Sequence, residues 1–221
     1  MPRRFTAQDL LDLEAVLSTP RLATYLRATN GDRHLAMQLY CWNAEISAAL
    51  YFMVQFCELA VRNGAVDALE RTFGENWHLN RGFYRTLPRL HGRYQPSDDI
   101  ASCASRLPTA GKVVADLKFA FWQYLFVKGQ DERMWNTQMD IAFPDRDPGL
   151  SVGQARAQMH GDIEKVRFLR NRIAHHEPIF SRRLDEDRDR IAKLVTWRRA
   201  GTGAWLASVQ TVTQLLDQRP G

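Results

Sequence analysis

The chain has 221 residues, of which 45% are hydrophobic, 25% charged and 10% aromatic, a globular composition that excludes a disordered or fibrous chain. Its three cysteines, Cys41, Cys57 and Cys103, form no CxxC pair, so neither a disulfide framework nor a cysteine-rich zinc site is expected. The net charge is +5 and 25 of the 30 basic residues are arginine, which indicates affinity for nucleic acid, although a GC-rich genome produces the same bias.

The sequence predicts neither a targeting segment nor a membrane span. The first residues carry two arginines without an apolar run, unlike a signal peptide. The longest apolar stretches, residues 48–54 and 119–127, are far shorter than the roughly 18 residues that span a bilayer. We therefore expect a soluble protein of the cytoplasm, where the cysteines stay reduced.

Helical periodicity runs through the chain, and strand signals are nearly absent. Near the start, helices are expected at residues 6–17, 21–28 and 32–73, the first of them capped by Thr6. The third carries apolar side chains at alternating steps of three and four, as a long packed helix does. These are Leu39, Trp42, Ile46, Ala49, Met53, Phe56 and Ala60. Gly74 is expected to end this helix.

The second half of the chain is also expected to be helical. Residues 75–96 predict a loop with one short helix, because they contain two prolines and two glycines. Further helices are predicted at residues 97–107, 109–127, 131–142, 154–176, 184–199 and 204–218. The sequence therefore predicts a single all-α domain over residues 1–221.

The most distinctive chemistry lies near the end of the predicted helix 154–176. Three apolar residues form a stripe that must face the core of the protein: Val166, Leu169 and Ile173. Asn171 and His175 are four residues apart, so they lie together on the opposite face, bordered by Arg170 and Arg167. One face thus displays a histidine, an asparagine and two arginines.

Those side chains suit cleavage of a phosphodiester. Neutral His175 can take a proton from a 2′-hydroxyl, and the imidazolium can protonate a leaving 5′-oxygen. Arg170 can hold the phosphate and stabilise the charge of the transition state. Asn171 can orient the imidazole or the phosphate. This chemistry needs no metal, and no cofactor is predicted.

Two other interpretations of the segment stay open. Arginine and histidine near a helix C-terminus also occur on ordinary solvated faces, where they stabilise the helix. A metal site would use His160, His175, His176 and Glu177. Adjacent histidines on a helix point about 100° apart, however, and the HExxH motif is absent. A reactive face and a solvated face are the main alternatives.

Four segments, in the same order, resemble a known family. The pair Arg170 and His175 matches the RxxxxH motif of HEPN domains, and residues 167–180 (RFLRNRIAHHEPIF) resemble the matching segment of abortive-infection proteins of the AbiD/AbiF-like family. Three more segments resemble that family: 39–50 (LYCWNAEISAAL), 57–69 (CELAVRNGAVDAL) and 116–126 (DLKFAFWQYLF). The resemblance covers most of residues 35–200; one departure is Ala120, where relatives often have glycine.

The resemblance implies an all-α, HEPN-like helical bundle with additional N- and C-terminal helices. It also implies antiviral defence and, in active members, metal-independent RNA cleavage at a dimer interface. Arg170, Asn171 and His175 are then the catalytic residues. The supporting residues expected around them are Glu58, Arg62, Asn63 and Arg167. An ordinary ion pair between residues four apart on a helix explains the first two equally well.

A second basic segment, residues 81–94 (RGFYRTLPRLHGRY), contains no acid and interleaves aromatic side chains with arginines. This pattern suits single-stranded RNA, because rings stack on bases and guanidinium groups pair with phosphates. The predicted RNA-binding residues are Arg81, Arg85, Arg89, Arg93, Tyr84 and Tyr94. The alternative is an arginine-rich loop whose aromatic side chains enter the core.

A reactive face that points away from its own core needs a second wall. We therefore expect a homodimer whose two-fold axis completes the site. The predicted function is an abortive-infection endoribonuclease, a toxin that leaves a 2′,3′-cyclic phosphate and a 5′-hydroxyl. Two alternatives are a non-catalytic HEPN protein that binds a structured or non-coding RNA, and a toxin held by an antitoxin or regulatory RNA. No membrane partner is expected.

Overall fold

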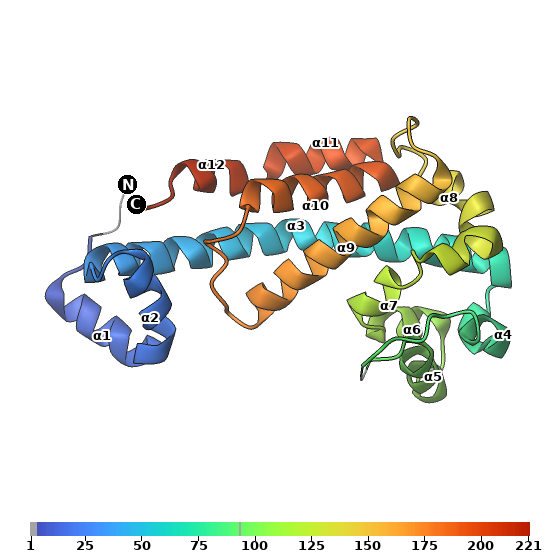
Figure 1. Ribbon diagram of the computed structural model, residues 1–221, viewed down its shortest axis with the longest axis horizontal. Coiled ribbons are helices and arrows are strands. Elements are labelled where there is room, and N and C mark those ends of the chain that lie inside the picture. Colours follow the sequence, from blue (N-terminus) through green and yellow to red (C-terminus); the bar gives the residue numbers. More distant parts are fainter. Residues whose placement is uncertain (1–3, 93) are drawn as a thin grey trace. The chain divides into compact units, whose positions relative to one another are not determined.

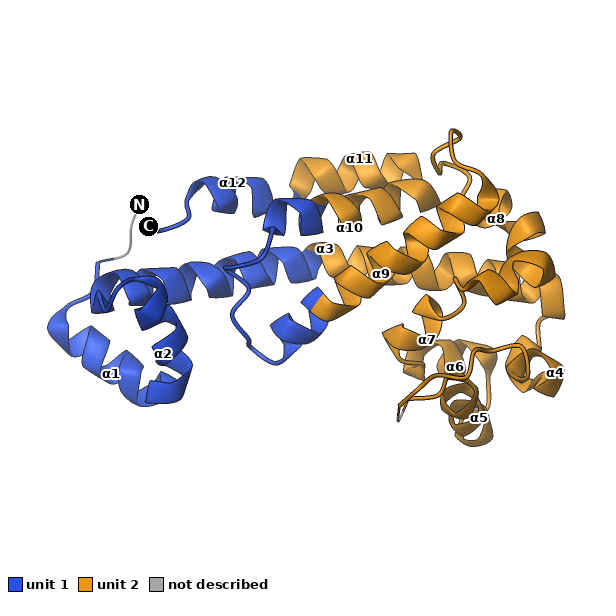
Figure 2. Cartoon of the chain, in the orientation of Figure 1, with its two compact units in different colours: residues 1–52, 169–188, 210–221 blue, residues 53–168, 189–209 orange. Residues whose placement is uncertain are grey.

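The computed structural model describes residues 4–92 and 94–221, and these residues contain helices and no strand (Figure 1). The predicted all-α class is confirmed. The chain forms two compact units (Figure 2): unit 1 comprises residues 1–52, 169–188 and 210–221, and unit 2 comprises residues 53–168 and 189–209. The single domain and the HEPN-like bundle stay predictions.

Unit 1 starts with two short helices, α1 (Ala7–Leu17) and α2 (Thr19–Ala28), followed by the first half of α3 (Arg33–Phe73). The Thr6 hydroxyl accepts the Asp9 N–H at 3.1 Å, and the Asp9 carboxylate accepts the Thr6 N–H at 2.8 Å. This capping box explains why α1 begins where the sequence predicts. The C-terminal helix α12 (Val212–Asp217) is held by the Trp42 indole N–H, which donates to the Leu215 carbonyl at 2.6 Å.

Unit 2 contains the second half of α3, which ends at Gly74 with φ +82° as predicted. Its other helices are α4 (Arg81–Tyr84), α5 (Pro96–Arg106), α6 (Ala110–Asp116), α7 (Phe119–Gln123), α8 (Asn136–Ala142) and α11 (Ala200–Val209). Short 3₁₀ or π-helical turns occur at Trp77–Leu79, Lys128–Gln130 and Asp131–Trp135. Helices α9 (Val152–Ala174) and α10 (Leu184–Arg198) contribute residues to both units.

The core of unit 2 is rich in aromatic side chains. Those with almost no exposed surface are Trp77, Phe83, Phe121, Trp122, Phe126, Trp135 and Phe143. The rings of Phe126 and Trp135 stack with centroids 4.4 Å apart. Gly64 allows α3 to approach this cluster, because a Cβ there would lie 2.5 Å from the Phe143 ring. A glycine inside a helix is therefore explained by packing, and α3 continues through it unbroken.

The prediction of one helix over residues 109–127 is wrong. The chain forms α6 and α7 with Leu117 and Lys118 extended between them. Helix α6 lies at the surface and buries only Val113, whereas α7 buries four of its five residues. A surface helix cannot continue straight into the core, so the chain turns at Leu117 and Lys118 to bring the aromatic residues inside.

Helix α3 is long and apolar enough to meet the criterion for a membrane-spanning helix. One 18-residue window has a mean hydropathy of 1.4, and 33% of it is buried inside the protein. By length and composition this helix could cross a membrane, but core helices of soluble proteins meet the same criterion. This is only a weak indication of a membrane span, and the cytoplasmic location stays a prediction.

The burial of Cys103 leads to a prediction about thiol reactivity. Its thiol donates to the Asp116 carboxylate at 3.2 Å, and burial together with this carboxylate raises the pKa of Cys103 to about 11. Burial also raises the pKa of Cys57. Since only a thiolate attacks a disulfide reagent, dithionitrobenzoate at pH 8 should label the partly exposed Cys41 alone. All three thiols should react in urea.

Mass spectrometry of the labelled protein checks this prediction. Raising the pH from 8 to 9.5 should leave Cys103 unlabelled, because its thiol stays protonated well above the ordinary thiol range of about 8.5. Rapid labelling of Cys103 in the folded protein at pH 8 would contradict the burial of this thiol and its bond to Asp116.

Candidate active site at the end of α9

Helix α9 ends at Ala174, two residues before the predicted end, and His175 follows as its C-cap. The His175 N–H still donates to the Asn171 carbonyl at 3.0 Å, as in a regular helical turn. The side chain of His175 is exposed, whereas Asn171 and Arg170 are half-buried. The three predicted catalytic residues therefore lie within the last turns of one helix, all of them in unit 1.

The backbone after His175 is left-handed. His176 has φ +54°, and its N–H donates to the Ile173 carbonyl at 3.0 Å. The Glu177 N–H donates to the Arg172 carbonyl at 2.8 Å. These two bonds form a Schellman motif, which ends the helix. The motif normally uses glycine, because a left-handed residue with a side chain costs roughly 1–2 kcal/mol, so the direction of the chain after His175 is specified by tertiary contacts.

Two arginines fix the segment that follows α9. The Arg21 guanidinium donates to the His176 carbonyl at 2.6 Å. The Arg172 guanidinium donates to the Pro178 carbonyl at 2.6 Å, and it lies 3.5 Å from the Glu177 carboxylate. Cations at the end of a helix stabilise its unpaired carbonyls. The backbone beside His175 is therefore held in place by side chains from α2 and from α9 itself.

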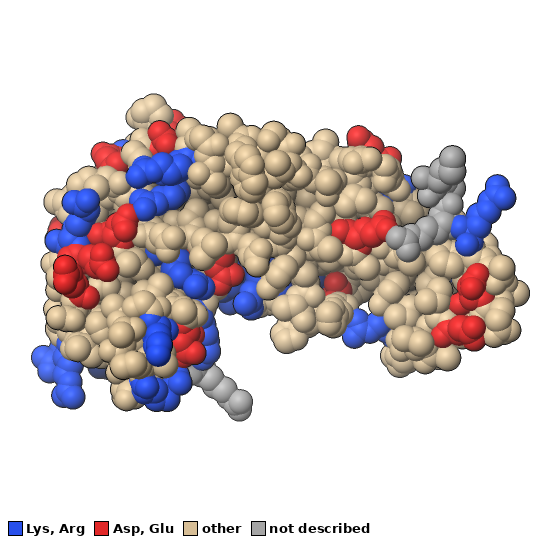
Figure 3. Space-filling model, turned by 180° about the vertical axis from the view of Figure 1, so that it is seen from behind, with Lys and Arg blue, Asp and Glu red and all other residues tan. Residues whose placement is uncertain are grey.

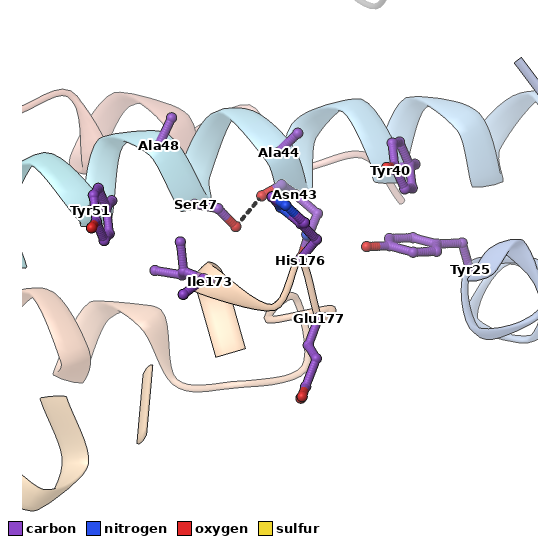
Figure 4. A pocket seen from close by; sticks show the side chains of 11 residues that line it. Tyr25, Tyr40, Asn43, Ala44, Ser47, Ala48, Tyr51, Ile173, His176 and Glu177 are labelled. Carbon is purple, nitrogen blue, oxygen red and sulfur yellow. Dashed lines mark hydrogen bonds between the residues drawn. The ribbon is translucent and has the colours of Figure 1, made fainter. Parts of the chain in front are cut away.

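Asn43 anchors the same segment from α3. Its side chain is buried, with 6% of its surface exposed, and Oδ1 accepts the N–H groups of Ile179 at 2.8 Å and Phe180 at 3.1 Å. The Asn43 carbonyl accepts the Ser47 hydroxyl at 2.6 Å, the bond dashed in Figure 4. One asparagine thus pairs two backbone donors that would otherwise be buried without acceptors.

A pocket of about 380 Å³ lies beside the end of α9 within unit 1 (Figure 4). Its lining includes the side chains of Tyr25, Tyr40, Asn43, Tyr51 and His176. Ala174 also lines the pocket, so His175 is flanked on both sides by pocket residues.

This pocket could not be predicted from the sequence, because its walls come from three separate segments: α2, α3 and the end of α9. A partial signal is present in the spacing of Tyr40, Ala44, Ser47, Ala48 and Tyr51, which fall on one helix face. That face carries two tyrosines and three small residues. It is less hydrophobic than a core stripe and less polar than a solvated face.

The predicted supporting residues lie in unit 2. Glu58 and Arg62 form an ion pair at 3.2 Å with 18% and 17% of their side chains exposed. Asn63 is exposed, and the Arg167 guanidinium donates to the Gln123 amide oxygen at 2.8 Å. Glu58, Arg62 and Arg167 therefore have local structural explanations, and a supporting role for the four residues stays a prediction.

The predicted RNA-binding segment combines exposed arginines with packed aromatic rings. Arg81, Arg85 and Arg89 are exposed, while Arg93 lies outside the described residues. Around α4 to α6, at the lower left of Figure 3, basic side chains are interleaved with acidic ones. The guanidinium groups of this segment are therefore open to a ligand, within a surface of mixed charge.

The aromatic residues of that segment already have partners. Tyr84 is half-buried and its hydroxyl donates to the His78 carbonyl. The Tyr94 hydroxyl donates to the Asp99 carboxylate at 3.0 Å, and its ring stacks on Tyr124 with centroids 6.1 Å apart. Phe83 is in the core, as the alternative interpretation expects. The hydroxyl groups of Tyr84 and Tyr94 are hydrogen-bonded to the protein. A role of these two rings in stacking on RNA bases stays a prediction.

Within residues 4–92 and 94–221, no three histidine, cysteine or acidic side chains are grouped in a way that could hold a metal ion. Comparison with known proteins finds no match to any family model, curated protein or solved structure. The resemblance to abortive-infection proteins is therefore carried by the four sequence segments alone.

Proposed function

We propose that this protein is a metal-independent endoribonuclease of the HEPN type that acts in antiviral defence in the cytoplasm. The observation that carries the proposal is the end of α9, where an exposed histidine caps the helix one turn after Asn171 and within two turns of the half-buried Arg170. Bonds from Arg21 and Asn43 hold the chain that follows. A solvent-accessible imidazole on a firmly held backbone, with an arginine in the same helical segment, supports acid–base chemistry on a phosphodiester.

In the proposed reaction, His175 takes the proton of a ribose 2′-hydroxyl, and the 2′-oxygen attacks the adjacent phosphorus. The bond from phosphorus to the 5′-oxygen breaks, and that oxygen receives a proton from an imidazolium. Arg170 donates hydrogen bonds to the non-bridging oxygens, whose negative charge increases in the transition state. Asn171 orients the imidazole or the phosphate. The products are a 2′,3′-cyclic phosphate and a 5′-hydroxyl.

The two proton transfers are most simply divided between two histidines. In a homodimer, a second copy of α9 across a two-fold axis would supply a second His175 and a second Arg170. One imidazole would then act as the base while the other acts as the acid. The exposure of His175 in the single chain is consistent with such a shared site.

The test is incubation of the purified full-length protein with single-stranded RNA in buffer containing EDTA. We expect fragments with 5′-hydroxyl ends, which polynucleotide kinase labels without prior phosphatase treatment, and a light-scattering mass of two chains. Binding of RNA without cleavage would favour the non-catalytic alternative. Cleavage that stops in EDTA would reject the metal-independent mechanism, and an active monomer would reject the shared site.

The exposed arginines of residues 81–94 lead to a prediction about RNA affinity. Replacing Arg81, Arg85 and Arg89 together by glutamine should weaken RNA binding and reduce the slope of log affinity against log salt by about 2, since each phosphate contact on a single strand contributes roughly 0.7. Folding stability should change little, because all three side chains are exposed. Fluorescence anisotropy over a salt series measures both quantities.

A matched variant replaces three other exposed arginines, Arg27, Arg71 and Arg199, by glutamine. It removes the same charge from the protein, so it should retain most of the salt slope. An equal loss in both triple variants would show that the overall charge, and no particular surface, attracts RNA.

A further inference from the structure

The pocket in unit 1 has aromatic walls suited to a planar ligand (Figure 4). Tyr25 comes from α2, and Tyr40 and Tyr51 come from α3. The rings of Tyr25 and Tyr40 meet edge to face with centroids 5.1 Å apart, and Tyr51 keeps 41% of its surface exposed. The volume of about 380 Å³ falls in the range of about 300–1,000 Å³ that encloses small molecules.

The pocket also contains a hydroxyl that can donate to a ligand. Tyr25 is 1% exposed, and its hydroxyl points into the pocket (Figure 4). Among the described residues no hydrogen bond to this hydroxyl is found. Burial and the neighbouring Tyr40 raise the pKa of Tyr25, so the group stays a neutral hydroxyl that can donate. The hydroxyl reaches the pocket space, where an acceptor on a ligand could receive its hydrogen bond.

Asn43 adds donors to the same pocket. Its amide oxygen is already used by the N–H groups of Ile179 and Phe180, which leaves the two N–H bonds of the amide nitrogen. In the part of the chain that the structure describes, no acceptor for them is found. Carbonyl oxygens and ring nitrogens of nucleobases are acceptors of this kind. The pocket thus offers ring faces and hydrogen-bond donors, a combination that suits a planar ligand with acceptor atoms.

The pocket lies next to His175, the residue proposed to transfer the proton. Ala174 and His176 both line it, and consecutive Cα atoms are only about 3.8 Å apart. His175 itself is not among the lining residues, but its backbone adjoins the pocket on both sides. A base held in the pocket would therefore have its ribose at the end of α9, where His175 stands. That ribose carries the 2′-hydroxyl whose proton the imidazole removes.

From these observations we infer that the pocket binds one nucleobase of the RNA substrate, the base whose ribose supplies the attacking 2′-hydroxyl. This inference rests on the proposed function and makes it more specific. Tyr51 provides a stacking surface, and Tyr25 and Asn43 donate hydrogen bonds to the edge of the base. Cleavage should accordingly depend on the identity of the base on the 5′ side of the broken bond.

The test measures binding without turnover, using the full-length protein and five separate ligands: AMP, GMP, CMP, UMP and ribose 5-phosphate, which lacks a base. Titration calorimetry should show at least one nucleotide binding at least about tenfold more tightly than ribose 5-phosphate. Tyr51→Ala should weaken that binding by roughly 5- to 100-fold, as loss of one base-stacking ring does. Tyr51→Phe keeps the ring and should restore most of the affinity that Tyr51→Ala loses, which separates stacking from the hydroxyl.

A second pair of variants compares a side chain that fills the pocket with one of the same size placed elsewhere on the surface. Ala44 is exposed on α3 and lines the pocket, so Ala44→Trp should abolish the preference for nucleotides. Ala15 is exposed on α1 outside the pocket, and Ala15→Trp should have no effect. Equal affinity for all five ligands would overturn the proposal. A base preference that survives both Tyr51→Ala and Ala44→Trp would overturn it as well.

Failure of this proposal can be told apart from failure of the proposed function. Base-dependent binding that both pocket variants remove, in a protein that cleaves no RNA, would support the pocket and reject the nuclease. RNA cleavage that requires His175, without base-dependent binding of nucleotides, would support the nuclease and reject the pocket.

Discussion

Replacing His175 by alanine should lower the rate of RNA cleavage by about 10²- to 10⁴-fold, the range expected when a general acid–base group is removed. The side chain is exposed and caps α9 through its backbone, so the substitution leaves the fold intact. The change in the free energy of unfolding should stay within about 0.5 kcal/mol. RNA affinity should change little, because the arginines that attract phosphate are still present. Single-turnover cleavage of a labelled RNA measures the rate.

His34 offers a matched control. It is also an exposed histidine of unit 1, on α3, and its ring lies 5.8 Å from that of Phe5. His34→Ala should cleave RNA at the unchanged rate. A His175→Ala protein that retains its activity within about twofold would remove His175 from the mechanism, whatever the His34 control shows.

The largest expected effect on stability comes from Asn43. Asn43→Leu should destabilise the protein by about 2–4 kcal/mol, because the buried N–H groups of Ile179 and Phe180 would lose their common acceptor and each unsatisfied group costs roughly 1–3 kcal/mol. The segment after α9 would also lose an anchor, so cleavage should fall together with stability. Urea denaturation gives the free energy of unfolding.

Asn43→Asp separates the two roles of this residue. A carboxylate keeps an oxygen for both N–H groups, so more of the stability should survive than in Asn43→Leu. It has no N–H to donate, and the proposed base binding should be lost. A Leu variant as stable as the unchanged protein would contradict the structural role that the two hydrogen bonds give to Asn43.

The parts of the fold that depend on local patterns could be predicted from the sequence. Thr6 followed three residues later by Asp9 is enough to start α1, because both partners of the cap lie in one turn. The apolar spacing along α3 and the glycine at position 74 mark a long helix and its end in the same way. The proximity of Asn171 and His175 follows from helical geometry alone.

The parts that depend on distant contacts could not be predicted. The break at Leu117 and Lys118 exists because α7 must enter the core, and no local signal marks it. The left-handed turn at His176 is held by Arg21, 155 positions earlier in the chain. The pocket needs three segments to meet. Whether Tyr84 and Tyr94 face solvent or protein likewise depends on His78 and Asp99.

The central claim is that His175 at the end of α9 cleaves RNA. Sequencing of 5′-hydroxyl RNA ends from cells expressing the protein tests it most directly, with His175→Ala at equal protein level as the comparison. The proposed mechanism predicts new 5′-hydroxyl ends that appear with the unchanged protein and are absent with His175→Ala. Identical sets of ends in the two samples would contradict it.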